Sequence, residues 1–165
     1  MSRRQAQTNA DRKNPKSEDE SLGQSEGVLK DSSEPPKSAD RRRNELDQIT
    51  EKVIGSAYAV RRALGSGFLE KVYENALAYE LREQGLKAEQ QHPIPVRYRG
   101  SLVGDFAADI LVEGAVLVEL KAVRALDDVH TAQCINYLKG TGLEVCLLLN
   151  FGTPRVQVKR IVNDF

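Results

Sequence analysis

The fold of this chain is decided by residues 105–123, DFAADILVEGAVLVELKAV. Two apolar runs, Asp105–Val112 and Val116–Val123, lie on either side of the pair Glu113-Gly114. Apolar runs of this length around a glycine-containing turn are typical of a β-hairpin. The sequence therefore predicts two antiparallel strands joined by a tight turn.

Three charged residues stand inside this predicted hairpin, Asp109 in the first strand and Glu119 and Lys121 in the second. Residues two apart in a strand point to the same face, so Glu119 and Lys121 share one. Asp109 joins them only if the turn has an odd number of residues, most simply three centred on Gly114 at positive φ, or if the ladder contains a bulge. A two-residue turn would place Asp109 on the opposite face.

Such a cluster has a chemical use. Two carboxylates that converge on one point form a site of hard oxygen ligands, the kind that Mg²⁺ prefers. A lysine beside them can orient or deprotonate an attacking water and offset charge on a phosphate. Asp109, Glu119 and Lys121 would together meet the needs of phosphodiester hydrolysis. The structural alternative is an internal Glu119–Lys121 ion pair or a solvated sheet face.

Two helices are predicted before the hairpin, because apolar residues recur there at three- and four-residue steps. The first begins at its N-cap Asn44 and ends at the glycines of residues 65–67, and the second ends at Gly85. Two prolines then exclude a helix and predict an edge strand or a kinked strand over Lys87–Tyr98.

After the hairpin, Leu126–Lys139 returns to a helical period, with Asp127 as the predicted N-cap. Leu143–Leu149 has the apolar composition of a strand covered on both faces. A last, more exposed strand is predicted from Val156, Val158 and Ile161. The order α-α-β-β-β-α-β-β predicts an α/β fold in which a mixed β-sheet is flanked by helices.

The composition of the chain changes near Asn44. Residues 1–44 hold few hydrophobic residues and no aromatic one, so we predict a disordered polar arm followed by one domain over residues 45–165. A basic cluster at residues 41–43 either contacts phosphate or is a solvated boundary. The whole chain has 24 Lys and Arg against 24 Asp and Glu, so its net charge does not indicate a nucleic-acid partner.

No apolar run approaches the roughly 18 to 20 residues of a membrane span, and no signal-peptide core follows the N-terminus. We therefore expect a cytoplasmic protein without a membrane partner. The cysteines, Cys134 and Cys146, are too few for a disulfide framework or a zinc site and are predicted to be buried apolar residues. A homo-oligomer is compatible with the sequence, which does not decide the oligomeric state.

The three charged residues of the hairpin, in this order of elements, resemble the PD-(D/E)XK nuclease superfamily. Residues 67–77, GFLEKVYENAL, are similar to the GxxExxY motif that names one bacterial family of that superfamily. The resemblance runs from about Leu46 to about Asn163. It departs from the superfamily pattern at Ala108, which stands where a proline precedes the aspartate, but the Asp109 carboxylate is retained.

The resemblance implies a restriction-endonuclease-like fold and metal-dependent cleavage of nucleic acid, which we expect to be DNA. It implies Mg²⁺ or Mn²⁺ as the cofactor, with Asp109 and Glu119 as ligands and Lys121 as a catalytic partner of both. Related nucleases also carry a glutamate near the metal on a helix, and Glu70 is the candidate. A glutamate in the first turn of a helix is also favoured by the helix dipole alone, and Glu74, one turn later, competes for the role.

In the helix predicted over residues 126–139, His130, Gln133 and Tyr137 fall on one face. The spacing of Gln133 and Tyr137 resembles the QxxxY element of RecB-like nucleases, which implies contacts with the substrate. The alternatives are a solvated helix face for His130 and Gln133 and a core position for Tyr137.

Two other function classes stay open. One is a nuclease-fold module that binds nucleic acid or a protein without cutting; the slightly acidic folded part favours it, and the retained charged residues argue against it. The other is an enzyme acting on a different substrate, or a structural module. Because phosphate binding normally needs a basic groove, the candidates for it are Arg61, Arg62, Lys71, Arg97, Arg99, Lys121, Arg124 and Lys139.

Overall fold

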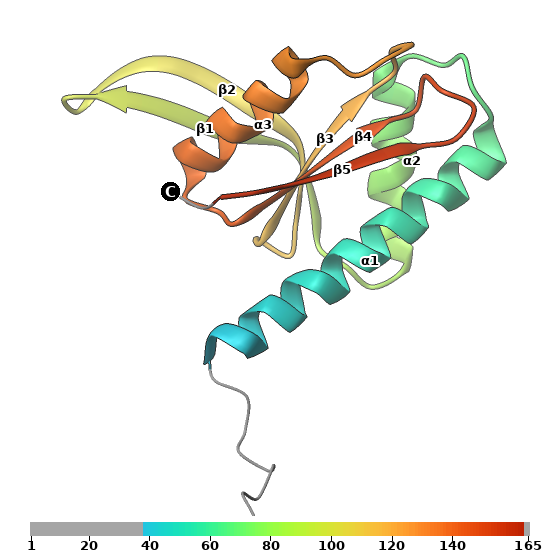
Figure 1. Cartoon of the computed structure of the whole chain (residues 1–165), viewed down its shortest axis with the longest axis horizontal. Coiled ribbons are helices and arrows are strands. Elements are labelled where there is room, and N and C mark those ends of the chain that lie inside the picture. Colours follow the sequence, from blue (N-terminus) through green and yellow to red (C-terminus); the bar gives the residue numbers. More distant parts are fainter. Residues whose placement is uncertain (1–37, 164–165) are drawn as a thin grey trace, which may run out of the picture. The chain divides into compact units, whose positions relative to one another are not determined.

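A mixed five-stranded sheet lies between two helices on one face and a third helix on the other (Figure 1). This computed structural model describes residues 38–163. Its elements in chain order are α1 Ser38–Leu64, α2 Glu70–Glu83, β1 Ala88–Tyr98, β2 Ser101–Val112, β3 Val116–Lys121, α3 Asp128–Thr141, β4 Val145–Asn150 and β5 Gln157–Val162. The predicted element order and the α/β fold with a mixed sheet are confirmed.

The strands lie in the order β1-β2-β3-β4-β5. Strand β3 pairs with β4 in parallel, and the other three neighbouring pairs are antiparallel. A parallel neighbour cannot be reached by a short turn, so the chain crosses over through α3 between β3 and β4. This crossover places α3 against the sheet beside the hairpin that carries the charged residues.

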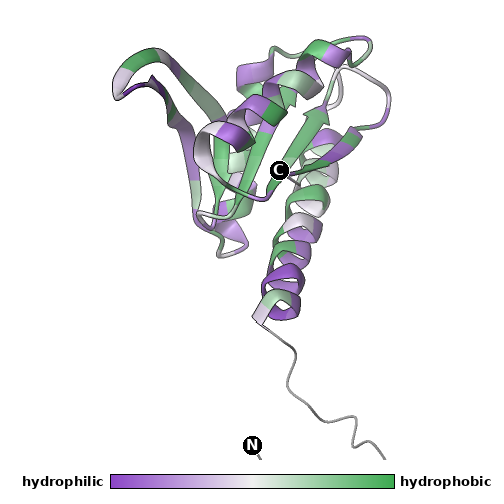
Figure 2. Cartoon of the chain, turned by 60° about the vertical axis from the view of Figure 1, so that its left-hand side comes forward, coloured by the Kyte–Doolittle hydropathy of each residue, from purple (hydrophilic) through white to green (hydrophobic). Residues whose placement is uncertain are grey.

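The core has two layers because the central strands are covered on both faces. Helices α1 and α2 pack on one face around Tyr73 and Leu77, and α3 packs on the other around Cys134 and Leu138. All six residues of β4 are buried, which confirms the strand predicted to be covered on both faces. Figure 2 shows these central strands as hydrophobic between more polar helices. Cys134 and Cys146 are free and buried, as predicted.

Helix α1 begins at Ser38, so the prediction of Asn44 as its N-cap is wrong. Residues 38–44 are exposed, and no apolar periodicity marks them as helical. Ala39 and the three arginines at 41–43 are good helix formers, and Asp40 in the first turn favours the helix dipole. This part of the predicted polar arm is therefore helical, and residues 1–37 of the arm lie outside the described residues.

Other element bounds differ from the prediction by a few residues. Strand β2 begins at Ser101, four residues earlier than predicted, because it forms a long hairpin with β1. Strand β3 ends at Lys121, two residues earlier than predicted. Helix α3 has Asp127 as its N-cap, as predicted, and ends at Thr141, followed by Gly142 as a left-handed C-cap. Within residues 38–163, no helix combines the length and apolar composition that a membrane span needs.

Candidate active site

The turn between β2 and β3 has the odd length that the site requires. Val112 pairs with Val116, so three residues form the loop, and its central Gly114 has φ of 64°. Strand pairing in this register is described up to Ile110 and Val118. The residues that follow on the two strands are Asp109 and Glu119, which therefore come level with one another. The prediction of an odd turn with Gly114 at positive φ is confirmed.

The alternation of side chains between the two faces of the sheet is interrupted in β2 at Asp109. Ala108 packs in the layer under α3, whereas Ile110 packs in the layer under α1 and α2, although residues two apart normally share a face. In β1, Gln90 pairs with Ile110 and His92 pairs with Ala108. Gln91, between them and level with Asp109, has φ of 53°, which a residue with a side chain rarely adopts. The ladder is thus locally distorted where Asp109 lies.

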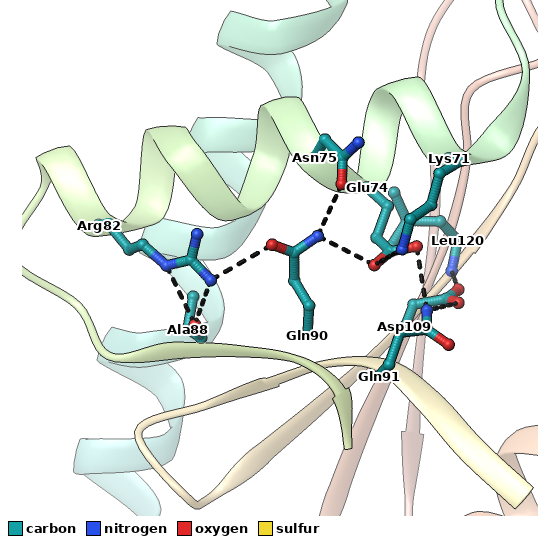
Figure 3. A network of polar contacts seen from close by, with 9 residues as sticks. All are labelled: Lys71, Glu74, Asn75, Arg82, Ala88, Gln90, Gln91, Asp109 and Leu120. Atoms are coloured by element: carbon teal, nitrogen blue, oxygen red, sulfur yellow. Dashed lines mark hydrogen bonds and ion pairs between the residues drawn. The ribbon is translucent and has the colours of Figure 1, made fainter. Parts of the chain in front are cut away.

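The Asp109 carboxylate is held by groups from two neighbouring strands. Its Oδ2 accepts a hydrogen bond from the backbone N–H of Leu120 at 2.8 Å, and its Oδ1 accepts one from Gln91 Nε2 at 3.4 Å (Figure 3). Burial raises the pKa of Asp109, although the Leu120 hydrogen bond and the Lys121 charge oppose the change. The side chain is therefore fixed between β2 and β3 in partly desolvated surroundings.

Glu119 and Lys121 form a close pair beside it. Lys121 Nζ lies 2.6 Å from Glu119 Oε1, and only 3% of Glu119 is exposed. Burial, followed by the negative charge of Asp109, raises the pKa of Glu119 to about 7. Burial alone would lower the pKa of Lys121, but the hydrogen bond to Glu119 and the surrounding carboxylates raise it. Lys121 is therefore a largely buried ammonium group that faces acids.

One oxygen of this pair is left without a partner. Glu119 Oε2 is buried and accepts no hydrogen bond from any residue between 38 and 163. A buried carboxylate oxygen without a donor is costly, and such groups call for an explanation such as a bound ion or water. The Lys121 ion pair accounts for Oε1 but not for Oε2.

Helix α2 brings a third carboxylate to the cluster. Glu70 is the first residue of α2, and its Oε1 lies 3.9 Å from Lys121 Nζ. The Glu70 charge also contributes to the raised pKa values of Asp109 and Glu119. Glu70 itself is about half exposed.

The glycine and tyrosine of the GxxExxY-like segment support the start of α2. The Tyr73 hydroxyl donates to the Gly65 carbonyl oxygen at 2.9 Å and accepts from the Phe68 N–H at 3.3 Å. The Tyr73 ring is fully buried and stacks on Phe151, with ring centroids 4.6 Å apart. Gly67 has φ of 104°, which only glycine adopts without strain. Glycine and tyrosine thus shape the loop from which Glu70 starts.

Glu74, the competitor of Glu70, is engaged elsewhere. It is 3% exposed, pairs with Lys71 at 2.7 Å, and accepts hydrogen bonds from Gln90 and Gln91, each at 3.0 Å (Figure 3). Gln91 therefore connects Glu74 to Asp109. Gln90 and Gln91 were not predicted from the sequence, because glutamines in a strand give no chemical signal and a positive φ is not visible in a residue type.

Helix α3 carries two of the predicted polar residues, Gln133 and Tyr137. Gln133 Nε2 donates to the Tyr137 hydroxyl at 2.7 Å, which brings the two predicted residues together. Burial raises the pKa of Tyr137, and the charges of Glu119, Lys121 and Asp109 also act on its hydroxyl. Tyr137 is 7% exposed, so the core alternative also describes its ring.

His130 has a different place. Its Nδ1 accepts a hydrogen bond from the Asp127 N–H at 2.9 Å, and it completes a reciprocal capping box at the start of α3. Among the predicted phosphate-binding residues, Arg61 donates to the Thr153 carbonyl at 2.9 Å, and Lys71 pairs with Glu74. These contacts explain the three side chains without a ligand.

The donor set suits a hard divalent cation. Asp109, Glu119 and Glu70 offer carboxylate oxygens only, and Glu119 Oε2 is an orphaned acceptor that a cation would satisfy. Within the described part of the chain, no three His, Cys, Asp or Glu residues are already arranged around one point. Mg²⁺ is commonly held by one or two carboxylates together with water and substrate phosphate, so the two strand carboxylates meet its minimum need.

Comparison with known proteins identifies the family to which the chain is similar. The model of the PD-(D/E)XK nuclease superfamily matches residues 47–161. No curated protein matches the chain. Among solved structures, SSO0001 is 19% identical with a TM-score of 0.45, covering 76% of this chain and 62% of its own. The alkaline exonuclease LHK-Exo from Laribacter hongkongensis is 14% identical with a TM-score of 0.36, covering 72% of this chain and 82% of its own.

The chain thus spans about three fifths of the length of SSO0001. The family match includes the whole hairpin, the first residue of α2 and all of α3. It therefore covers every element that contributes a side chain to the cluster described above. This chain belongs to the PD-(D/E)XK nuclease superfamily.

Proposed function

We propose that this protein hydrolyses phosphodiester bonds in nucleic acid, with a divalent cation held by Asp109 and Glu119. The observation that carries the proposal is the buried Glu119, whose Oε2 has no donor within residues 38–163 although Lys121 holds its other oxygen. A structural ion pair needs one acid and one base. Here a second acid, Asp109, lies level with Glu119. The two carboxylates repel one another, and a purely structural role does not explain that repulsion.

We propose Mg²⁺ or Mn²⁺ as the ion and DNA as the substrate. When bound, such an ion polarises a phosphoryl oxygen and lowers the pKa of a coordinated water. Asp109 is already fixed by Leu120 and Gln91, so its ligand oxygen needs little reorganisation. Glu70, which is half exposed and near Lys121, is the proposed third oxygen ligand.

Lys121 is proposed to act as a cation. Because its pKa is raised, its Nζ keeps three protons and donates hydrogen bonds to a phosphate oxygen or to the attacking water. In this role Lys121 offsets the negative charge that develops on the phosphate. It is less suited to deprotonating the water, since a base must first lose its own proton.

Two residues of α3 are proposed to bind the substrate. Gln133 and Tyr137, joined by a 2.7 Å hydrogen bond next to the charged cluster, are proposed to contact the substrate. The segment from Gly67 to Tyr73 supports assignment to the GxxExxY family within the superfamily, because its glycine and tyrosine have defined roles at the start of α2.

A cleavage assay tests the function. The purified chain is incubated with Mg²⁺ or Mn²⁺ and labelled single-stranded, duplex and branched DNA, and with the corresponding RNA. We expect cleavage that EDTA stops and that Asp109→Asn and Glu119→Gln abolish. Glu83→Gln, which changes an exposed carboxylate at the end of α2, is the matched control and should cleave like the natural chain. Absence of cleavage of every substrate with either ion would refute the hydrolytic function.

One observation favours a second candidate, a module of the same fold that binds without cutting. Lys121 already neutralises Glu119 at 2.6 Å, so the cluster is partly balanced without an ion. Calorimetry separates the two functions: a non-cutting module should bind nucleic acid but show no binding of millimolar Mg²⁺ or Mn²⁺.

A further inference from the structure

A groove of about 1030 Å³ is lined by residues of the β1–β2 hairpin and of α3. Val96 and Phe106 from the hairpin face Val129 and Ala132 from the helix across it. Its volume is at the upper end of the roughly 300–1,000 Å³ typical of small-molecule pockets, and it is open rather than enclosed. The function proposed above uses only one corner of it, at Gln133 and Tyr137.

The groove exposes large apolar side chains that a stable core would bury. Phe106 is 53% exposed and Val129 is 69% exposed. The Phe106 ring lies against Gly104, where an added Cβ would come within 2.9 Å of the ring. Because Gly104 has no side chain, the Phe106 ring can pack directly against its backbone. The centroids of the Phe106 and Tyr137 rings are 6.3 Å apart, so the two aromatic residues form one continuous wall.

A second glycine sets how closely the two walls approach. An added Cβ at Gly140 of α3 would lie 2.9 Å from the Ile94 side chain of β1. Ile94 is only 1% exposed and forms part of the groove floor. Helix and hairpin thus approach one another closely at Gly140 and Ile94, and both residues line the groove.

The polar groups of the groove have one sign of charge. Its ionisable lining residues with full charge are Arg97 and Lys139, both basic, and no acidic residue of the described chain lines it. Gln133 and Asn136 add amide groups that both donate and accept hydrogen bonds. Basic groups, amides and aromatic rings together complement phosphates, base edges and base faces.

The groove leads to the catalytic candidates through Tyr137. This residue lines the groove, and it packs in the same core layer as Ala108, which precedes Asp109 in β2, and Leu117, two residues before Glu119 in β3. A chain lying along the groove would therefore pass the carboxylates at its end.

We propose that this groove binds an unpaired strand of nucleic acid and directs it to Asp109 and Glu119. The inference rests on the proposed hydrolytic function and names its substrate class. In a duplex the base faces are stacked on one another, so exposed apolar walls gain nothing from it. In an unpaired strand each base offers a flat face to an aromatic ring, and its phosphates meet the basic side chains.

Binding without metal tests this inference. Fluorescence anisotropy in EDTA compares a labelled oligothymidine or oligouridine of 15 residues with a labelled duplex, under conditions in which the proposed cleavage cannot occur. We expect the unpaired strand to bind more tightly. Phe106→Ala should weaken its binding about 5- to 150-fold, the range for loss of one stacked base, and leave duplex binding unchanged.

Three matched variants sharpen the result. Phe106→Tyr keeps the ring and should bind like the natural chain, whereas Phe106→Leu keeps apolar area and should bind weakly. Tyr79→Ala removes an exposed aromatic residue on α2, outside the groove, and should have no effect. Full binding by Phe106→Leu would overturn the inference, because any apolar side chain would then suffice.

The outcomes separate this inference from the function on which it rests. If the duplex binds as tightly as the unpaired strand and Phe106→Ala weakens neither, the groove assignment is wrong, while metal-dependent cleavage of duplex would still uphold the hydrolytic function. If the unpaired strand binds through Phe106 but neither it nor any other substrate is cut with Mg²⁺ or Mn²⁺, the groove assignment holds and hydrolysis is refuted. A dimer that Phe106→Ala converts to a monomer, without any change in oligonucleotide binding, would overturn the inference in favour of self-association.

Discussion

The amide of Gln91 lies 3.4 Å from Asp109, and the same Gln91 has a left-handed backbone with φ of 53°. Its Nε2 also donates to Glu74 Oε2 at 3.0 Å, so one side chain connects two acids. Left-handed backbone costs a residue with a side chain about 1 kcal/mol or more and persists only where neighbours enforce it. The distortion places Gln91 where it can hold Asp109, which makes it a positioning residue for the proposed site.

Replacement of Gln91 by Ala should therefore affect both stability and the site. The buried Glu74 loses one of its donors, which should lower the free energy of unfolding by about 1–3 kcal/mol. Asp109 keeps the Leu120 hydrogen bond but loses its second contact, so Mn²⁺ affinity by calorimetry should fall severalfold. Gln84→Ala is the control, because among residues 38–163 the Gln84 amide bonds Glu80 alone, through a solvent-exposed hydrogen bond, and it should change stability by less than about 0.5 kcal/mol. An unchanged Mn²⁺ affinity in Gln91→Ala would show that Gln91 does not position Asp109.

A divalent ion should stabilise the protein through the two strand carboxylates. Asp109 and Glu119 repel one another, and a bound cation relieves that repulsion in the folded state only. At an ion concentration 100 times the dissociation constant, the gain should be about 2.7 kcal/mol, visible as a higher Tm by calorimetry. Asp109→Asn and Glu119→Gln should each abolish the increase, whereas Glu83→Gln should keep it. An equal rise in Tm in all four proteins would mean that the ion binds elsewhere.

Without metal, stability should depend on pH through Glu119. Burial and the Asp109 charge raise its pKa to about 7 in the folded state, against an ordinary value of 4.5. The folded protein therefore binds the proton more tightly than the unfolded chain, so stability is highest below about pH 4.5 and declines as pH rises towards 7. The raised pKa of Asp109 acts in the same direction. Urea unfolding in EDTA between pH 5 and 8 should show this decline, and Glu119→Gln should flatten it; the same slope in both proteins would assign the effect to other groups.

Lys121→Ala should separate metal binding from catalysis. Lys121 competes with a cation for Glu119, so its removal should leave Mn²⁺ affinity equal or higher. The proposed cleavage should slow by a factor on the order of 10²–10⁴, because the phosphate loses a hydrogen-bond donor and a compensating charge. Calorimetry and single-turnover cleavage measure the two effects separately. Retention of full cleavage would remove Lys121 from the catalytic group.

The parts of the site that sequence reasoning predicted are those encoded by pattern. Alternation along β3 places Glu119 and Lys121 on one face, and the odd length of the turn around Gly114 brings Asp109 level with Glu119. Both features depend on local spacing alone. The same is true of the Asp127 cap and of the contact between Gln133 and Tyr137 within one helix.

The parts that sequence reasoning missed depend on contacts between distant segments or on exposed residues. The positive φ of Gln91 follows from its neighbours Glu74 and Asp109, which lie 17 and 18 residues away in the chain. The groove arises where the β1–β2 hairpin passes α3, and no residue type marks that crossing. Helix α1 begins at Ser38, before Asn44. Its residues 38–44 are all exposed, so they carry no periodic pattern of apolar residues that would predict a helix.

Tyr73 links the start of α2 to the core. Its hydroxyl bonds both Gly65 and Phe68 across the loop from which Glu70 begins, while its ring stacks on Phe151. Tyr73→Phe keeps the stacked ring and removes only the hydroxyl, so the loss of stability should be about 1 kcal/mol. Because the loop then loses its anchor, Glu70 should be held less firmly beside Lys121, and the proposed cleavage should slow more than Tm alone would suggest.

The comparison for that prediction is Tyr79→Phe, which removes the same hydroxyl from an exposed position on the same helix. It should change neither Tm nor cleavage. A double variant, Tyr73→Phe with Glu70→Gln, tests whether the two residues act together. If its cleavage is slowed by the product of the two single effects, the hydroxyl and Glu70 act independently, and the loop does not position the glutamate. If the double variant is no slower than Glu70→Gln alone, the effect of Tyr73 on cleavage runs through Glu70, as the hydrogen bonds at the start of α2 predict.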